Sequence, residues 1–161
     1  VLQELHGVDW MDFYSEFNGE LDSDVCVEAI AWLDECSLSV LREKLVEANY
    51  PGLIMDGVFA ASFETWDGVE DSDILAMRKI DEDRYFFDYA FDIRGLEVKL
   101  LSSPTSPASG YFGAYIDVEI DNDLATTSFF TRVDFKASVV FNITAEVVED
   151  VDVTSFKFRP R

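Results

Sequence analysis

Residues 84–101 read RYFFDYAFDIRGLEVKLL, and this stretch decides the fold. Over residues 85–93 apolar side chains alternate with polar or small ones, which is the period of two expected of a half-buried strand. Gly95 interrupts the pattern, so residues 96–100 are predicted to form a further strand. The acidic triplet at 81–83 predicts a turn just before the stretch. Together these signals indicate an antiparallel sheet built from hairpins.

The same alternation continues on both sides of this stretch. Further strands are predicted at residues 58–63, 75–80, 112–120, 129–147 and 151–158. The run at 129–147 is too long for one ordinary strand, so it predicts a bent strand or one that crosses a curved sheet. In the last strand the apolar parity changes between Val153 and Phe156, which predicts a bulge. The parity assigned to the core carries Phe87, Phe91, Phe135 and Phe141.

Residues 1–50 have apolar side chains at helical spacing, and they predict about three helices. The first is expected to stop at Asn18-Gly19 and the second to begin near Ser23. The third is expected to be capped by Ser37 or Ser39 and to end before Pro51. The fold class predicted is therefore α+β. A helical lobe at 1–50 precedes a curved antiparallel meander of six to seven strands at 51–161, and the two share one core.

The composition indicates one folded domain in a reducing compartment. The chain has 161 residues, of which 48% are hydrophobic, and it contains 14 Phe. Such a chain buries roughly 70% of its unfolded surface and needs no disulfide or metal for stability. Its two Cys do not form a disulfide scaffold. Neither a signal peptide nor an apolar run of about 18 residues is visible, so a cytoplasmic protein without a membrane span is expected.

The charge is strongly acidic and unevenly placed. Lys and Arg number 12 and Asp and Glu number 33, which gives a net charge of −21. No Lys or Arg precedes Arg42, whereas ten acidic residues do: Glu4, Asp9, Asp12, Glu16, Glu20, Asp22, Asp24, Glu28, Asp34 and Glu35. Direct binding to nucleic acid or to an anionic membrane is disfavoured, because both are themselves anionic.

Three interpretations of this acidic segment stay open. It is a solvated surface that keeps the protein soluble, a docking face for a basic protein partner, or a mimic of nucleic acid that inhibits a DNA- or RNA-binding protein. The candidate contact residues are Asp12, Glu16, Glu20, Asp24 and Glu28. The function predicted is a non-enzymatic protein-binding or regulatory module, with the mimic as the alternative.

A second candidate contact surface lies on the outer face of the predicted sheet. Phe86, Tyr115 and Phe130 have the parity opposite to the inferred core, and so do Leu101, Val140 and Val148. If several of them sit on neighbouring strands, they form an apolar patch that a partner covers. The alternative is that both faces of the sheet are buried.

No catalytic, cofactor-binding or metal-ligating residue is predicted. The segment at 67–73 packs four carboxylates around Gly68, but their spacing does not match an EF-hand loop. His6 is the only His, and the two Cys lie far from it, so four ligands for zinc are lacking. No GxGxxG or GxxxxGK[ST] motif is present. A metal-dependent hydrolase that uses the acidic loops stays open as a second alternative.

One family resemblance covers residues 54–158. The sequence Trp66-Asp67-Gly68-Val69-Glu70-Asp71, followed by Ile74-Leu75, Lys79-Ile80-Asp81-Glu82-Asp83 and Tyr85-Phe86, resembles the β-rich region that follows the nuclease domain in bacterial PIN-like proteins. In that family the catalytic acidic residues belong to a separate α/β domain. No such domain is visible here. The resemblance therefore implies an accessory portion of a longer bacterial protein, without an active site.

Overall fold

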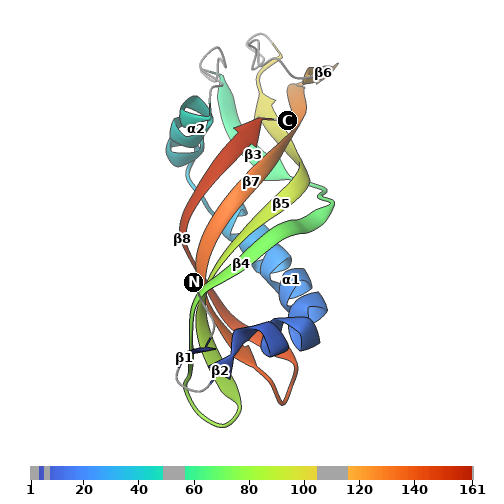
Figure 1. Cartoon of the computed structure of the whole chain (residues 1–161). Helices are drawn as coiled ribbons and strands as arrows, with labels where there is room; N and C mark the ends of the chain where they lie inside the picture. Colours follow the sequence, from blue (N-terminus) through green and yellow to red (C-terminus); the bar gives the residue numbers. More distant parts are fainter. Residues whose placement is uncertain (1–3, 6–7, 49–56, 105–115, 161) are drawn as a thin grey trace. The chain divides into compact units, whose positions relative to one another are not determined.

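The computed structural model describes residues 4–5, 8–48, 57–104 and 116–160 (Figure 1). Its elements, in chain order, are β1 (Glu4–Leu5), β2 (Val8–Asp9), α1 (Trp10–Asp34), α2 (Leu38–Glu47), β3 (Val58–Phe63), β4 (Gly68–Lys79), β5 (Arg84–Ser102), β6 (Ile116–Asp121), β7 (Leu124–Asn142) and β8 (Val147–Pro160). In the six-stranded sheet β3, β5, β7 and β6 are successive neighbours, β4 pairs with β5, and β8 pairs with β7. β1 and β2 form a separate antiparallel pair.

The described part of the chain has two helices, so the prediction of about three, and with it the predicted fold class, was wrong. α1 runs without a break through Asn18-Gly19 and through Ser23. The buried residues Phe13, Phe17, Leu21, Val25 and Ala29 recur at every fourth position along it. Burying one Phe, Leu or Val side chain contributes roughly 1.5–3 kcal/mol, whereas a Gly inside a helix costs about 1 kcal/mol. Packing against the sheet therefore keeps the helix continuous.

Two predicted interruptions of the sheet are also absent. The acidic segment at 67–73 was expected to be a loop, yet β4 begins at Gly68 and includes most of it. β5 continues past Gly95, where a break was expected. Gly95 has a φ of 63°, and a Cβ atom placed there would collide with the carboxylate of Asp67. Glycine permits this backbone conformation and this close approach, so the strand continues instead of ending.

The chain divides into two compact units. The first comprises Val1–Ala31, Gly68–Ile93 and Asp134–Phe156, and the second comprises Trp32–Asp67, Arg94–Val133 and Lys157–Arg161. The first unit contains most of α1, all of β4 and parts of β5, β7 and β8. The second contains α2, β3 and β6 with the remaining parts of the three long strands.

Aromatic rings fill the core of the first unit. The Phe13 ring of α1 lies 5.5 Å from Phe87 of β5 and 5.5 Å from Phe141 of β7, measured between centroids. Phe91 stacks on Phe135 at 5.3 Å. The four phenylalanines predicted to face inward are at most 3% exposed, which confirms their parity. Each ring pair adds about 0.5–1.5 kcal/mol beyond the area it buries.

The second unit has a smaller helix over its strands. α2 is capped by Ser37, whose Oγ accepts a hydrogen bond from the backbone N–H of Val40 at 3.3 Å. Its buried residues are Leu41 and Leu45. β3 pairs antiparallel with β5, and β6 pairs antiparallel with β7. Of the two serines predicted as caps, Ser37 is the one that caps the helix.

Candidate functional site

Five acidic residues occupy every fourth position of α1, and we name them the acidic row: Asp12, Glu16, Glu20, Asp24 and Glu28. Each directly precedes a buried residue of the helix, so the row runs beside the stripe that faces the core. All are exposed except Asp24. Successive members are separated by about 6 Å along the helix axis. The structure therefore places all five acidic residues predicted to make contacts on one helix, in a row that turns by about 40° from each member to the next.

Asp24 differs from the other members because it already has a structural partner. It is half-buried, and its Oδ2 accepts a hydrogen bond from the backbone N–H of Val148 at 3.1 Å, near the start of β8. Within the described ranges no ion pair involves Glu16, Glu20 or Glu28. These three exposed carboxylates are therefore the members of the row best placed to meet a cation from outside the chain.

The structure describes two of the three aromatic residues predicted as an outer patch, and they lie in different units. Phe86 is half-buried in the first unit, where the guanidinium carbon of Arg78 lies 4.9 Å from its ring centroid. Phe130 is 40% exposed and belongs to the second unit. Tyr115 lies outside the described residues. In the first unit, Arg78 thus covers part of the Phe86 ring.

A polar cluster joins α1 to β4 and β5, and we name it the Tyr–Asp cluster: Tyr14, Asp22, Ser72 and Tyr89. The hydroxyl of Tyr89 donates to Oδ1 of Asp22 at 2.6 Å. The hydroxyl of Tyr14 lies 3.5 Å from Oδ2 of Asp22 and 2.6 Å from Oγ of Ser72. Tyr89 is fully buried and the other three are half-buried. A carboxylate in this setting is held by neutral hydroxyl groups.

Burial dominates the ionisation of this cluster. Desolvation raises the pKa of Asp22, and the hydrogen bonds from Tyr89 and Tyr14 oppose the rise without cancelling it. Burial and the bond to Asp22 raise the pKa of Tyr89. One helical turn beyond Asp22, burial and the nearby Asp22 charge raise the pKa of Cys26 to about 11. Cys26 is therefore a thiol at neutral pH and a poor nucleophile.

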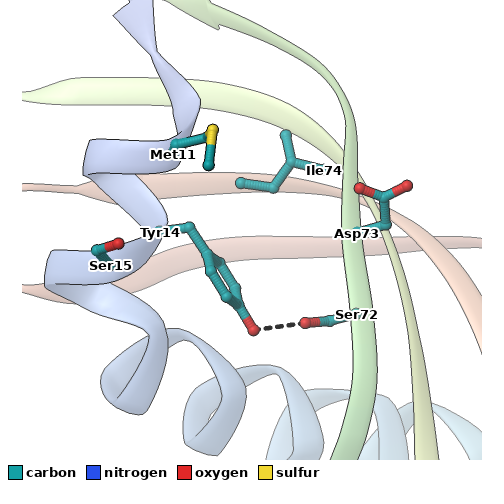
Figure 2. A pocket seen from close by; sticks show the side chains of 6 residues that line it. All are labelled: Met11, Tyr14, Ser15, Ser72, Asp73 and Ile74. Atoms are coloured by element: carbon teal, nitrogen blue, oxygen red, sulfur yellow. Dashed lines mark hydrogen bonds between the residues drawn. The ribbon is translucent and has the colours of Figure 1, made fainter. Parts of the chain in front are cut away.

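A pocket of about 300 Å³ opens beside the Tyr–Asp cluster. Its lining residues are Met11, Tyr14, Ser15, Ser72, Asp73 and Ile74. Figure 2 shows Tyr14 reaching from α1 toward Ser72 on β4, with Met11 directed toward Ile74 above them. The lining thus combines apolar side chains with hydroxyl groups and the carboxylate of Asp73, and it includes no Lys, Arg or His.

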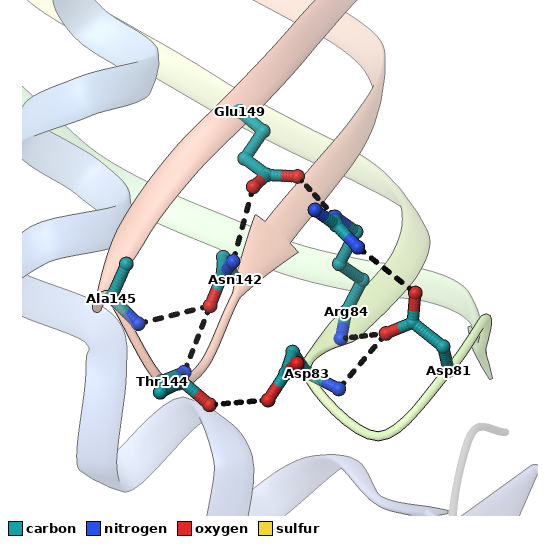
Figure 3. Close-up of polar contacts among 7 residues, drawn as sticks. All are labelled: Asp81, Asp83, Arg84, Asn142, Thr144, Ala145 and Glu149. Atoms are coloured by element: carbon teal, nitrogen blue, oxygen red, sulfur yellow. Dashed lines mark hydrogen bonds and ion pairs between the residues drawn. The ribbon is translucent and has the colours of Figure 1, made fainter.

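A second polar cluster ties together the turn before β5 and the turn before β8 (Figure 3). The hydroxyl of Thr144 donates to Oδ1 of Asp83 at 2.6 Å, and the backbone N–H of Ile143 donates to the Asp83 carbonyl at 2.8 Å. Arg84 pairs with Glu149 at 2.6 Å and with Asp81 at 3.0 Å. The turn predicted at 81–83 therefore connects the β4–β5 hairpin to the β7–β8 hairpin.

The acidic segment at 67–73 is used for folding. Oδ1 of the buried Asp92 accepts hydrogen bonds from the backbone N–H groups of Glu70 at 3.0 Å and Asp71 at 2.8 Å.

Among the described residues, no three His, Cys, Asp or Glu side chains are grouped so as to hold a metal ion. The described helices include none that is long and apolar enough to cross a membrane.

Sequence reasoning missed the Tyr–Asp cluster and the pocket. Tyr14, Asp22 and Cys26 lie on one i, i+4 row of α1, but only if the helix continues through Asn18-Gly19, where a stop was predicted. With a continuous helix, the spacing of Tyr14, Asp22 and Cys26 would have suggested a polar stripe beside the core.

Comparison with protein-family models, with curated proteins and with solved structures finds no match for this chain.

Proposed function

We propose that the chain is a non-enzymatic protein-binding or regulatory module that docks the basic surface of a protein partner on its acidic row. The observation that supports this is geometric. Glu16, Glu20 and Glu28 project from one rigid helix, and no ion pair within the described ranges engages them. A row of like charges on a helix that the core holds in place is preorganised for a complementary surface.

The buried stripe beside the row explains why the row does not need to reorganise on binding. Phe13 and Phe17 anchor the helix on the Phe141 ring, with centroid distances of 5.5 Å and 5.1 Å. Asp24 ties the same helix to the backbone of β8. A partner therefore meets carboxylates on a fixed backbone, and no entropy is lost in ordering that backbone when they are engaged.

The alternative function is a nucleic-acid mimic, and the spacing of the row favours it less than it favours docking on a protein. Because α1 does not break at Asn18-Gly19, Asp12, Glu16 and Glu20 carry charge at intervals of about 6 Å along one axis. A strand of DNA carries one charge per about 3.4 Å of axis. The row is thus a sparser line of charge than a nucleic acid strand, which makes a general basic protein surface the better match.

Capture from a lysate of the source organism at low salt tests the proposal. Beads carry the wild-type chain, the row variant Glu16→Lys/Glu20→Lys/Glu28→Lys, or the control Asp117→Lys/Glu119→Lys/Asp123→Lys. Both variants change the net charge equally, and all six positions are exposed. We expect a partner that the wild type and the control retain and that the row variant loses. Equal capture by all three would contradict docking on the row, and displacement of the partner by duplex DNA would favour the mimic.

A further inference from the structure

The carboxylate of Asp22 has hydrogen-bond donors but no cationic partner among the described residues. Its hydrogen bonds come from the hydroxyls of Tyr89 and Tyr14, and within the described ranges no ion pair joins it to Lys or Arg. Anions withdrawn from water are usually paired with a cation, because neutral donors recover only part of the lost solvation. A positive charge brought close to this carboxylate would therefore be stabilised.

Tyr14 links the pocket to this carboxylate. Tyr14 and Ser72 line the pocket, and their oxygens lie 2.6 Å apart. The same Tyr14 oxygen is 3.5 Å from Oδ2 of Asp22, which is a long and weak contact. A cation that reached these two hydroxyl oxygens would replace that weak contact and would lie close to the Asp22 charge.

The shape and chemistry of the pocket select the cation. Met11 is 62% exposed and provides an apolar wall. The acceptors are the single hydroxyl oxygens of Tyr14, Ser15 and Ser72 and the carboxylate of Asp73. An aliphatic stem that ends in an ammonium group matches walls and acceptors of this kind. The three N–H donors of an ammonium group rotate freely and can meet such separate oxygens, whereas the donors of the arginine fork are fixed in one plane. The acidic row begins in the same turns of α1 that supply Met11 and Tyr14.

We propose that this pocket receives a lysine side chain of the basic partner, with its stem along Met11 and its ammonium group at the oxygens of Tyr14 and Ser72, beside Asp22. The inference rests on the proposed function, since the lysine belongs to the protein that docks on the acidic row. It assigns to the partner an exposed lysine that is inserted, while its neighbouring basic residues meet the row.

The test uses the methyl groups of methionine as reporters. The full chain is labelled with 13C at its Met methyls and titrated with a capped glycine-lysine-glycine peptide. Met11 lines the pocket, and Met77 is 3% exposed in the core and reports whether the fold is intact. We expect a saturable shift at Met11 and none at Met77. A peptide with norleucine in place of lysine has the same stem without the ammonium group and should give no saturable shift.

Variants then locate the ammonium group. Tyr14→Phe and Asp22→Asn should each weaken lysine binding about tenfold, as expected for the loss of one contact to a charged group. Tyr85→Phe removes a hydroxyl from the same unit, next to Phe13, and should leave binding unchanged. An equal response to the norleucine peptide, a stronger response to an arginine peptide, or an equal loss in Tyr85→Phe would each overturn the assignment.

Failure of the pocket and failure of the proposed function give different results. If Glu16→Lys/Glu20→Lys/Glu28→Lys abolishes capture of the partner and Tyr14→Phe leaves capture unchanged, the result contradicts the pocket proposal and supports docking on the row. If the lysine peptide binds saturably and the same triple variant leaves capture unchanged, the result contradicts docking on the row and supports the lysine pocket.

Discussion

The hydroxyl of Tyr89 donates a hydrogen bond to Oδ1 of Asp22 over 2.6 Å, which joins β5 to α1 across 67 residues of sequence. Tyr89 is fully buried, and Asp22 is a half-buried residue of α1. This contact fixes the face of α1 that meets the sheet, and with it the direction in which the acidic row projects. It also makes the ionisation of one carboxyl group part of the stability of the fold.

The stability of the protein should depend on pH through Asp22. Its pKa is raised in the folded chain, so between the unfolded and folded pKa values the folded state binds more protons. This contribution to stability is present below the unfolded pKa and is lost as pH rises through the folded pKa. Urea unfolding of the wild type and of Asp22→Asn over a pH series should show the wild type losing stability relative to the variant as pH rises above about 4. A difference that is constant with pH would contradict the raised pKa.

Removing the Tyr89 hydroxyl should destabilise the fold. Tyr89→Phe leaves the partly buried Asp22 carboxylate without its short hydrogen bond, at a cost of about 1–3 kcal/mol in the free energy of unfolding. Tyr85→Phe is the matched control, and its cost should be small. Equilibrium urea unfolding measures both variants. Equal free energies of unfolding for the two would show that the Tyr89–Asp22 bond does not stabilise the fold.

The two faces of β5 should differ sharply in their tolerance of truncation. Phe87 is 0% exposed in the aromatic core. Phe87→Ala should therefore lower the free energy of unfolding by about 3–5 kcal/mol, through lost burial and a residual cavity. Phe86 is half-buried beneath Arg78, so Phe86→Ala should cost much less. Similar losses at both positions, measured by denaturant unfolding, would mean that both faces of β5 are packed.

The two thiols should react at different rates. Burial raises the pKa of Cys26 to about 11, and Cys26 is buried in the first unit. Cys36 is only partly buried. Iodoacetamide at pH 8 should therefore modify Cys36 first and Cys26 only when the protein opens, as mass spectrometry of Cys36→Ser and Cys26→Ser variants would measure. Modification of Cys26 at the rate of Cys36 would contradict the burial of Cys26.

The strands could be predicted because their signal is local. Alternation at 85–93 assigns Phe87 and Phe91 to the core without knowledge of any partner strand, and both are buried. The change of parity between Val153 and Phe156 also appears in the structure, where both are buried. Neither of these assignments depends on contacts between residues that are far apart in the sequence.

The helices were mispredicted because tertiary packing outweighs the local signal. Asn18-Gly19 is a strong stop in an isolated peptide, but Phe17 and Leu21 on either side of it are buried and hold α1 together. The Tyr–Asp cluster was missed for the same reason and also because its members are far apart in the sequence. Its contacts join residues 58 and 67 positions apart, and no sequence period connects them.

The most direct test of docking on the acidic row is the salt dependence of the rate at which the captured partner associates with this chain. Stopped-flow measurements should give a rate constant that falls steeply between about 0.02 M and about 0.3 M salt, because exposed charges are screened beyond about 10 Å at 0.1 M. Glu16→Lys/Glu20→Lys/Glu28→Lys should be slow at every salt concentration, while Asp117→Lys/Glu119→Lys/Asp123→Lys should behave like the wild type. A wild-type rate that is independent of salt, or equal slowing by both variants, would contradict docking on the acidic row.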